Sequence, residues 1–181
     1  MAKSNPQFGV LAAAVLALAA GPSWAQTPGP LIAGYGKVAP VETPGERPDP
    51  ALDYKVVINV TKAGEAGAPP PYLDKAARLA NLLATAGVPA EHRHIVAVLS
   101  GGATTAVLTE AGTKAHGLGP NPSVELIARL IAAGVRVDVC GQAMAGAGIA
   151  PHEVLPGIQI DLSALTTLSN LQLRGYALLP D

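Results

Sequence analysis

Residues 135–144 read Val-Arg-Val-Asp-Val-Cys-Gly-Gln-Ala-Met, and the rest of the chain is best understood from this segment outward. Its alternating valines predict a short strand, because β-branched side chains favour extended backbone. Gly134 ends the helical pattern that precedes the strand. After Cys140 the period of two is lost, and the small residues 143–147 indicate a tightly packed helical turn. Cys140, the only cysteine, is therefore expected where a strand passes into a helix, the edge at which parallel sheets bind ligands.

Strand and helix patterns alternate on either side of this segment. Further strands are expected at 54–60, 94–99, 157–160 and 175–179. Helices are expected at 72–86, 103–110, 124–133 and 163–173, with a single turn at 151–155 and a loop at 112–120. This alternation predicts a single three-layer α/β/α domain with a mostly parallel five-stranded sheet. The loops after Val60, Leu99 and Val139 then converge on one edge, because crossovers between parallel strands are right-handed.

Composition limits the classes of function. The 181 residues suffice for one domain, and the net charge of -1 gives no basic excess to favour nucleic acid or an anionic membrane surface as a partner. Hydrophobic residues make up 49% of the chain but aromatic residues only 3%, so the core is expected to be aliphatic, as in a covered parallel sheet. With one cysteine, no disulfide can form within the chain.

The N-terminus has the pattern of an export signal. Lys3 supplies positive charge, residues 8–20 are apolar, and Ser23-Trp24-Ala25 fits a cleavage site after Ala25. We therefore expect residues 1–25 to be a cleaved signal peptide and the mature protein to be periplasmic. An uncleaved anchor is the alternative, but the apolar run is shorter than the roughly 20 residues that a spanning helix needs.

Residues 26–52 are rich in proline and glycine and have almost no periodic apolar pattern. Such a segment buries too little to offset its ordering entropy, so we expect a disordered tether. The alternative is that Leu31-Ile32 or residues 38–41 pack on the domain or on a neighbouring subunit. The domain is expected to span residues 53–181.

A set of motifs within this domain has a familiar order. They are Asn121-Pro122, Val139-Cys140-Gly141-Gln142, Leu155-Pro156-Gly157, Ser163-Ala164-Leu165 and Leu171-Gln172 leading to Gly175-Tyr176. Together they resemble the DsrE/DsrF-like family over about residues 53–181. The resemblance implies a flavodoxin-like domain that assembles as a homotrimer or homohexamer. Where a relative would have His-Gly after the second strand, this chain has Ser100-Gly101.

The same resemblance implies that Cys140 carries sulfane sulfur, as the better studied cytoplasmic branch of the family does on its conserved cysteine. We therefore expect a periplasmic sulfur-binding or sulfur-relay protein, at most a sulfurtransferase-like carrier acting through a cysteine persulfide. Its partner would be a small sulfur species or a sulfur-carrier protein, and no cofactor is expected. The alternative is a non-catalytic, homo-oligomeric small-ligand-binding protein in which the cysteine is structural.

Sulfur transfer requires a thiolate, because the thiolate attacks a persulfide or disulfide sulfur. The amides of Gly141, Gln142 and Ala143 are the natural donors to it, since they would open the following helix. The competing interpretation is a small, buried and inert Cys140. The Gln142 side chain is equally suited to binding a ligand or capping the helix.

Other candidate residues have weaker patterns. Asn121 is a helix cap or a ligand-binding side chain, and Ser100-Gly101 is a turn whose amides could bind a small anion. No dinucleotide or phosphate-loop pattern surrounds that turn. His92 and His94 have a spacing that a metal site could use, but they belong to the amino edge and are expected to face solvent, so no metal site is predicted. His116 and His152 belong to loops that could approach Cys140.

Overall fold

Five strands form one sheet in the order β4-β3-β2-β1-β5, and every pairing in it is parallel. They are β1 (Tyr54–Val60), β2 (Arg93–Leu99), β3 (Arg136–Cys140), β4 (Gln159–Asp161) and β5 (Ala177–Leu179). The computed structural model describes residue 1 and residues 30–181, so the signal peptide predicted at 1–25 lies almost wholly outside the described residues. Within the described part, the predicted five-stranded parallel sheet is confirmed.

Two amphipathic helices cover one face of the sheet. These are α1 (Pro71–Thr85), which begins with proline in its first turn, and α3 (Val124–Ala132). Their buried side chains, such as Leu73 and Leu130, pack with Ile58 and the other inward residues of the strands. This is the larger of the two aliphatic cores, and burial of its methyl and methylene groups is the main stabilising contribution.

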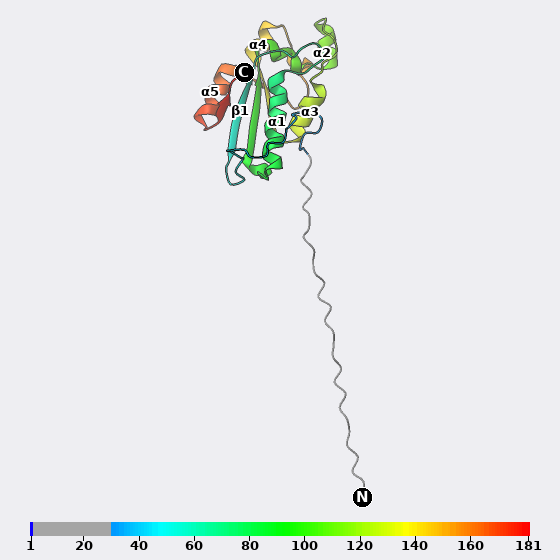
Figure 1. Ribbon diagram of the computed structural model, residues 1–181. Coiled ribbons are helices and arrows are strands. Elements are labelled where there is room, and N and C mark those ends of the chain that lie inside the picture. Colours follow the sequence, from blue (N-terminus) through cyan, green and yellow to red (C-terminus); the bar gives the residue numbers. More distant parts are fainter. Residues whose placement is uncertain (2–29) are drawn as a thin grey trace.

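A single helix, α5 (Ala164–Leu173), covers the opposite face. The chain moves steadily from β1 to β4 in one direction, so right-handed crossovers place the intervening helices on one face. It then returns past β1 to add β5, and this reversal puts α5 on the other face. Figure 1 shows α5 on the left of the sheet and α1 and α3 on the right. The fold is therefore the expected three-layer α/β/α arrangement, in which one of the two helical layers consists of α5 alone.

Shorter helices connect the strands at the carboxyl edge. They are η2 (Gly101–Val107), α2 (Glu110–Ala115), α4 (Gly141–Gly146) and η3 (Pro151–Glu153), while η1 (Ala90–His92) precedes β2 at the opposite edge. The helix predicted at 103–110 is a 3₁₀ helix that ends at Val107, and the loop predicted at 112–120 begins later than expected, because α2 extends to Ala115. Leu108 pairs with Val154 in an isolated bridge, and the Thr109 hydroxyl then caps α2 by accepting a hydrogen bond from the Gly112 amide at 3.1 Å.

The last two strands are shorter than predicted. β4 starts at Gln159 rather than 157, and β5 at Ala177 rather than 175. Gly157 and Gly175 have φ angles of 83° and 86°, so each serves as a turn residue before its strand.

The predicted tether needs correction at residues 30–37. Ile32 is only 1% exposed, and the buried Asn81 side chain on α1 bonds to both the amide and the carbonyl of Ile32. The Gly36 amide also donates to Asp74 at 2.8 Å. This part of the segment packs on the domain, the alternative expected for Leu31-Ile32, because side chains of α1 satisfy its backbone groups. Val38 and Val41 are exposed.

In the described residues, no helix combines the length and apolar character required to cross a membrane.

Candidate functional site

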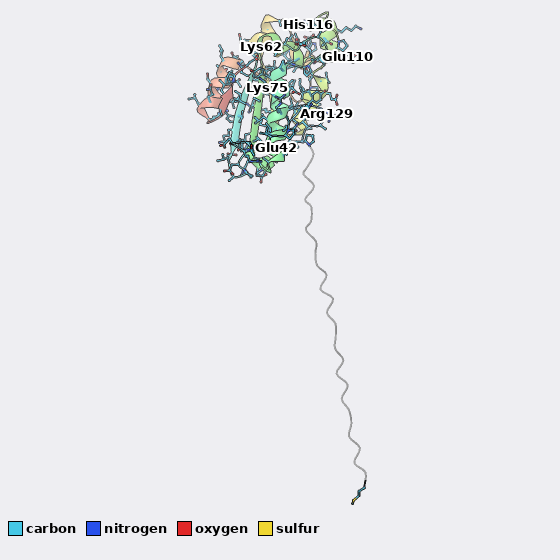
Figure 2. All side chains as sticks on the ribbon, in the orientation of Figure 1. Glu42, Lys62, Lys75, Glu110, His116 and Arg129 are labelled. Atoms are coloured by element: carbon cyan, nitrogen blue, oxygen red, sulfur yellow. The ribbon has the colours of Figure 1, made fainter. Side chains whose placement is uncertain are left out.

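The loops after β1, β2 and β3 meet at the carboxyl edge of the sheet, as predicted. The Ser100 amide donates to the Val60 carbonyl, and the Ala103 amide donates to the Thr61 carbonyl, both at 3.0 Å. Figure 1 shows α4 and the C-terminus at this edge, and Figure 2 shows the side chain of Lys62 there as well. Ligands of parallel sheets bind at this edge, so the candidate residues are in the expected place.

Cys140 ends β3 and immediately precedes α4, which confirms the predicted passage from strand to helix. Its side chain is 5% exposed and lies on the α5 face, in the smaller core with Val98, Ala164 and Leu171. The thiol is thus enclosed between the sheet and the start of α5.

The protein surroundings of the thiol favour its ionised form. Burial raises the pKa of Cys140, but hydrogen bonds from the amides of Ala164, Ala143 and Gln142 and from the Ser163 hydroxyl outweigh burial and lower the pKa below its ordinary value. The donors come from the start of α4 and the start of α5, so two helices direct amides at one sulfur.

The sequence pointed to only part of this donor set. Gln142 and Ala143 were expected because they follow Cys140 directly, whereas Gly141 is not among the main donors to the sulfur. Ser163 and Ala164 were missed, because their approach depends on how β4 is placed beside β3. The side chain of Gln142 is exposed, so its contribution at the sulfur is made by its backbone.

Two carboxylates near Cys140 were also missed. Asp138 is fully buried, and Arg136 binds it with Nε at 3.0 Å from both oxygens and Nη2 at 2.8 Å from one. Asp161 accepts hydrogen bonds from Thr167 Oγ1 at 2.7 Å and from Gln159 Nε2 at 2.6 Å. Charged residues at alternate positions of the otherwise apolar strand β3 were the available signal.

Burial raises the pKa of Asp138 to about 6. Hydrogen bonding and attraction from Arg136 act in the opposite direction, and the neighbouring Asp161 raises the pKa further. Asp138 therefore changes charge in mildly acidic solution.

Asn121 has a structural role. Its Nδ2 donates to the carbonyls of Ala106 and Leu108 at 2.8 and 2.7 Å, and its Oδ1 accepts from the Ser123 amide at 2.9 Å. The residue before the helix is Ser123 rather than Asn121, since α3 begins at Val124. Asn121 also lines a pocket of about 190 Å³ whose other walls include Gly102, Thr105 and the 63–70 loop.

Ser100 and Gly101 hold two loops together. Gly101 has a φ of 53°, and a Cβ there would lie 3.2 Å from the Thr61 carbonyl oxygen. The Ser100 amide donates to the Val60 carbonyl. One amide of the turn that was predicted to bind an anion therefore already has a protein partner.

Three histidines have protein partners. His94 Nε2 lies 2.8 Å from Asp53 Oδ1, and His92 Nδ1 lies 3.3 Å from the Pro50 carbonyl. His116, which follows α2 at the edge seen in Figure 2, has Nε2 at 3.2 Å from Glu153 Oε2. Across residue 1 and residues 30–181, no group of three or more His, Cys, Asp or Glu side chains is placed to hold a metal ion.

Comparison with known proteins identifies the family. The model of the DsrE/DsrF-like family matches residues 55–180. The chain belongs to the DsrE/DsrF-like family. The matched range contains all five strands except the first residue of β1, together with Cys140 and both missed carboxylates. No curated protein matches this DsrE/DsrF-like chain in sequence.

Two solved structures share the fold. MTH1491 of Methanobacterium thermoautotrophicum, described as a protein of unknown function, is 18% identical with a TM-score of 0.54, and the match covers 71% of this chain and 100% of that chain. The YchN protein of E. coli is 21% identical with a TM-score of 0.53, with coverage of 71% and 99%. At these identities the likeness establishes the flavodoxin-like fold of the DsrE/DsrF-like domain.

Proposed function

We propose that this protein binds or relays sulfane sulfur on Cys140, in the periplasm, as a homo-oligomeric carrier. Membership of the DsrE/DsrF-like family supports a role of the sulfur-relay type at the level of the family. The observation that carries the proposal is the set of donors around Cys140, which lowers its pKa despite burial. A lowered pKa enlarges the thiolate fraction at neutral pH, and the thiolate is the form that takes up sulfur.

The proposed step requires no cofactor. The Cys140 thiolate attacks the terminal sulfur of a donor persulfide or polysulfide, and a bond forms between Sγ and that sulfur. The sulfur–sulfur bond of the donor breaks, and its electron pair leaves with the shortened donor as a thiolate or sulfide. The reverse reaction passes the sulfur to an acceptor thiolate, so neither an external oxidant nor a reductant is consumed.

Access to Cys140 restricts the donors. Because only 5% of the residue is exposed, we expect a small polysulfide or an extended persulfide arm to reach the sulfur more easily than a rigid protein surface does. Leu162 and Leu165, at the start of α5, are 74% and 79% exposed. This apolar surface beside the site is consistent with the proposed homotrimer or homohexamer, or with contact to a sulfur-carrier protein.

The test is the intact mass of reduced protein containing residues 26–181, after brief exposure to inorganic polysulfide and removal of the excess. We expect the mass of one or more sulfur atoms to be added, the addition to be reversed by a reductant, and none to occur in Cys140→Ser. No addition to the folded wild-type protein, with ready addition after denaturation, would rule out the proposal.

A second candidate is a non-catalytic protein that binds a small ligand at the same edge. The pocket lined by Asn121, Gly102 and Thr105 and the burial of Cys140 favour it. It predicts a thiol that is unreactive in the folded protein, which is the contrary outcome of the mass measurement.

A further inference from the structure

The thiol and two carboxylates share one face of the sheet. Arg136, Asp138 and Cys140 alternate along β3, so their side chains project to the same side. Asp161 is the register partner of Cys140 on β4, which places the two Cα atoms about 4.8 Å apart. The bond from Thr167 of α5 to Asp161 confirms that the Asp161 side chain projects to the α5 face.

The groups that surround this pair are mixed in charge. On β3 and β4 they are Arg136 and Gln159, and α5 contributes Thr167. On the neighbouring strand β2, Val96 and Val98 lie beside Arg136 and Asp138. Arg136, which pairs with Asp138, is the only cation bonded to either carboxylate in the described residues, so the cluster carries one uncompensated negative charge when both carboxylates are ionised.

We propose that Asp138 and Asp161 are positioning residues that control the charge beside Cys140, so that proton uptake by the pair keeps the thiol reactive in mildly acidic solution. The inference deepens the proposed sulfur chemistry and rests on it. Neither carboxylate needs to touch the sulfur, because a charge held in a buried site acts over the spacing of neighbouring strands.

The direction of the effect follows from the charges. Above about pH 6 Asp138 is ionised, and its negative charge opposes formation of the Cys140 thiolate, because like charges repel. As the pH falls through about 6, Asp138 takes up a proton and the net charge of the cluster approaches zero. The pKa of Cys140 then decreases. The thiolate fraction therefore falls by less than tenfold for each pH unit, whereas an isolated thiol loses the full tenfold below its pKa.

The experiment is the rate of alkylation of Cys140 by iodoacetamide between about pH 5 and 8. In the wild-type protein we expect two inflections, one from the carboxyl pair and one from the thiol. In Asp138→Asn we expect a single inflection, from the thiol. Its midpoint should move to lower pH, which corresponds to an increase of about three- to tenfold in the acid dissociation constant of Cys140. In Asp161→Asn the acid inflection should move to lower pH, since one cause of the raised Asp138 pKa is removed.

Asp53→Asn is the matched control. It also removes one carboxylate, but Asp53 is exposed and pairs with His94 at the far end of the sheet, so the profile should not change. A wild-type profile that is described by the titration of a single group would overturn the proposal without any variant. The proposal would also be overturned if the midpoints in Asp138→Asn and Asp161→Asn were equal to those of the wild-type protein. Circular dichroism confirms that the compared proteins are folded.

Alkylation needs no sulfur donor, so the two proposals fail separately. Two inflections in a protein that takes up no polysulfide sulfur would refute the sulfur proposal and leave the control of the thiol standing. If the protein took up polysulfide sulfur but its alkylation profile showed the titration of a single group, only the proposed role of the carboxyl pair would be refuted.

Discussion

Gly141 brings β4 close to the start of α4. A Cβ at this position would lie 2.7 Å from the backbone carbonyl oxygen of Asp161, and a backbone atom cannot move aside as a flexible side chain can. We expect Gly141→Ala to lower the free energy of unfolding by about 1 to 3 kcal/mol, the usual cost of overpacking. Urea unfolding measures this change.

Gly146→Ala is the control, because it ends the same helix in open space. That variant should gain up to about 1 kcal/mol from the higher helix propensity of alanine. Equal stability of the two variants would contradict the close approach of Asp161 to α4.

At the residue scale, the sequence located the thiol but not its surroundings. The alternating valines and the following small residues were enough to place Cys140 at the end of a strand. Asp161 and Ser163 could not be placed beside it, because their approach depends on the pairing of β3 with β4, and pairing of parallel strands leaves no local signal.

Among the elements, α5 has two functions, since its first residues both start the helix and bond to the thiol. The Ser163 hydroxyl accepts from the Leu165 amide at 3.3 Å, and its hydrogen bonding also lowers the pKa of Cys140. Ser163→Ala should therefore lower stability by about 1 kcal/mol, as the loss of a cap does, and should raise the pKa of Cys140. Thermal unfolding and the pH dependence of thiol alkylation measure the two effects.

Thr109→Ala provides the comparison, because Thr109 caps α2 at a distance from the thiol. It should cost similar stability and leave the pKa of Cys140 as it is in the wild type. A shift of the thiol midpoint in Thr109→Ala equal to that in Ser163→Ala would indicate a general loosening rather than a lost hydrogen bond.

Prediction of the elements succeeded where the apolar period was long. The strand at 54–60 agrees with the structure, and the helix at 72–86 differs by one residue at each end. Prediction was less accurate at 103–110, where the 3₁₀ helix η2, an isolated bridge and the start of α2 follow one another. Such short units have too few residues to show a period.

At the scale of the whole molecule, the order of the strands was not derivable from the sequence. The return of the chain past β1 to β5 leaves α5 alone on its face, and this is why the thiol, the carboxyl pair and the exposed leucines of α5 occupy one side of the domain. Composition also misjudged residues 30–37. The prolines and glycines of the whole 26–52 segment indicated a tether, but Ile32 is buried, and side chains of Asn81 and Asp74 on α1 bond to the backbone of residues 30–37.

The most direct test of the proposed chemistry is the ultraviolet absorbance of the thiolate in the folded protein, titrated with pH and corrected with Cys140→Ser. If the amides of α4 and α5 stabilise the ionised sulfur, the midpoint will lie below the ordinary pKa of a cysteine thiol. A midpoint at or above that value would mean that burial prevails at Cys140. The cysteine would then be part of the core, and sulfur transfer through it would be refuted.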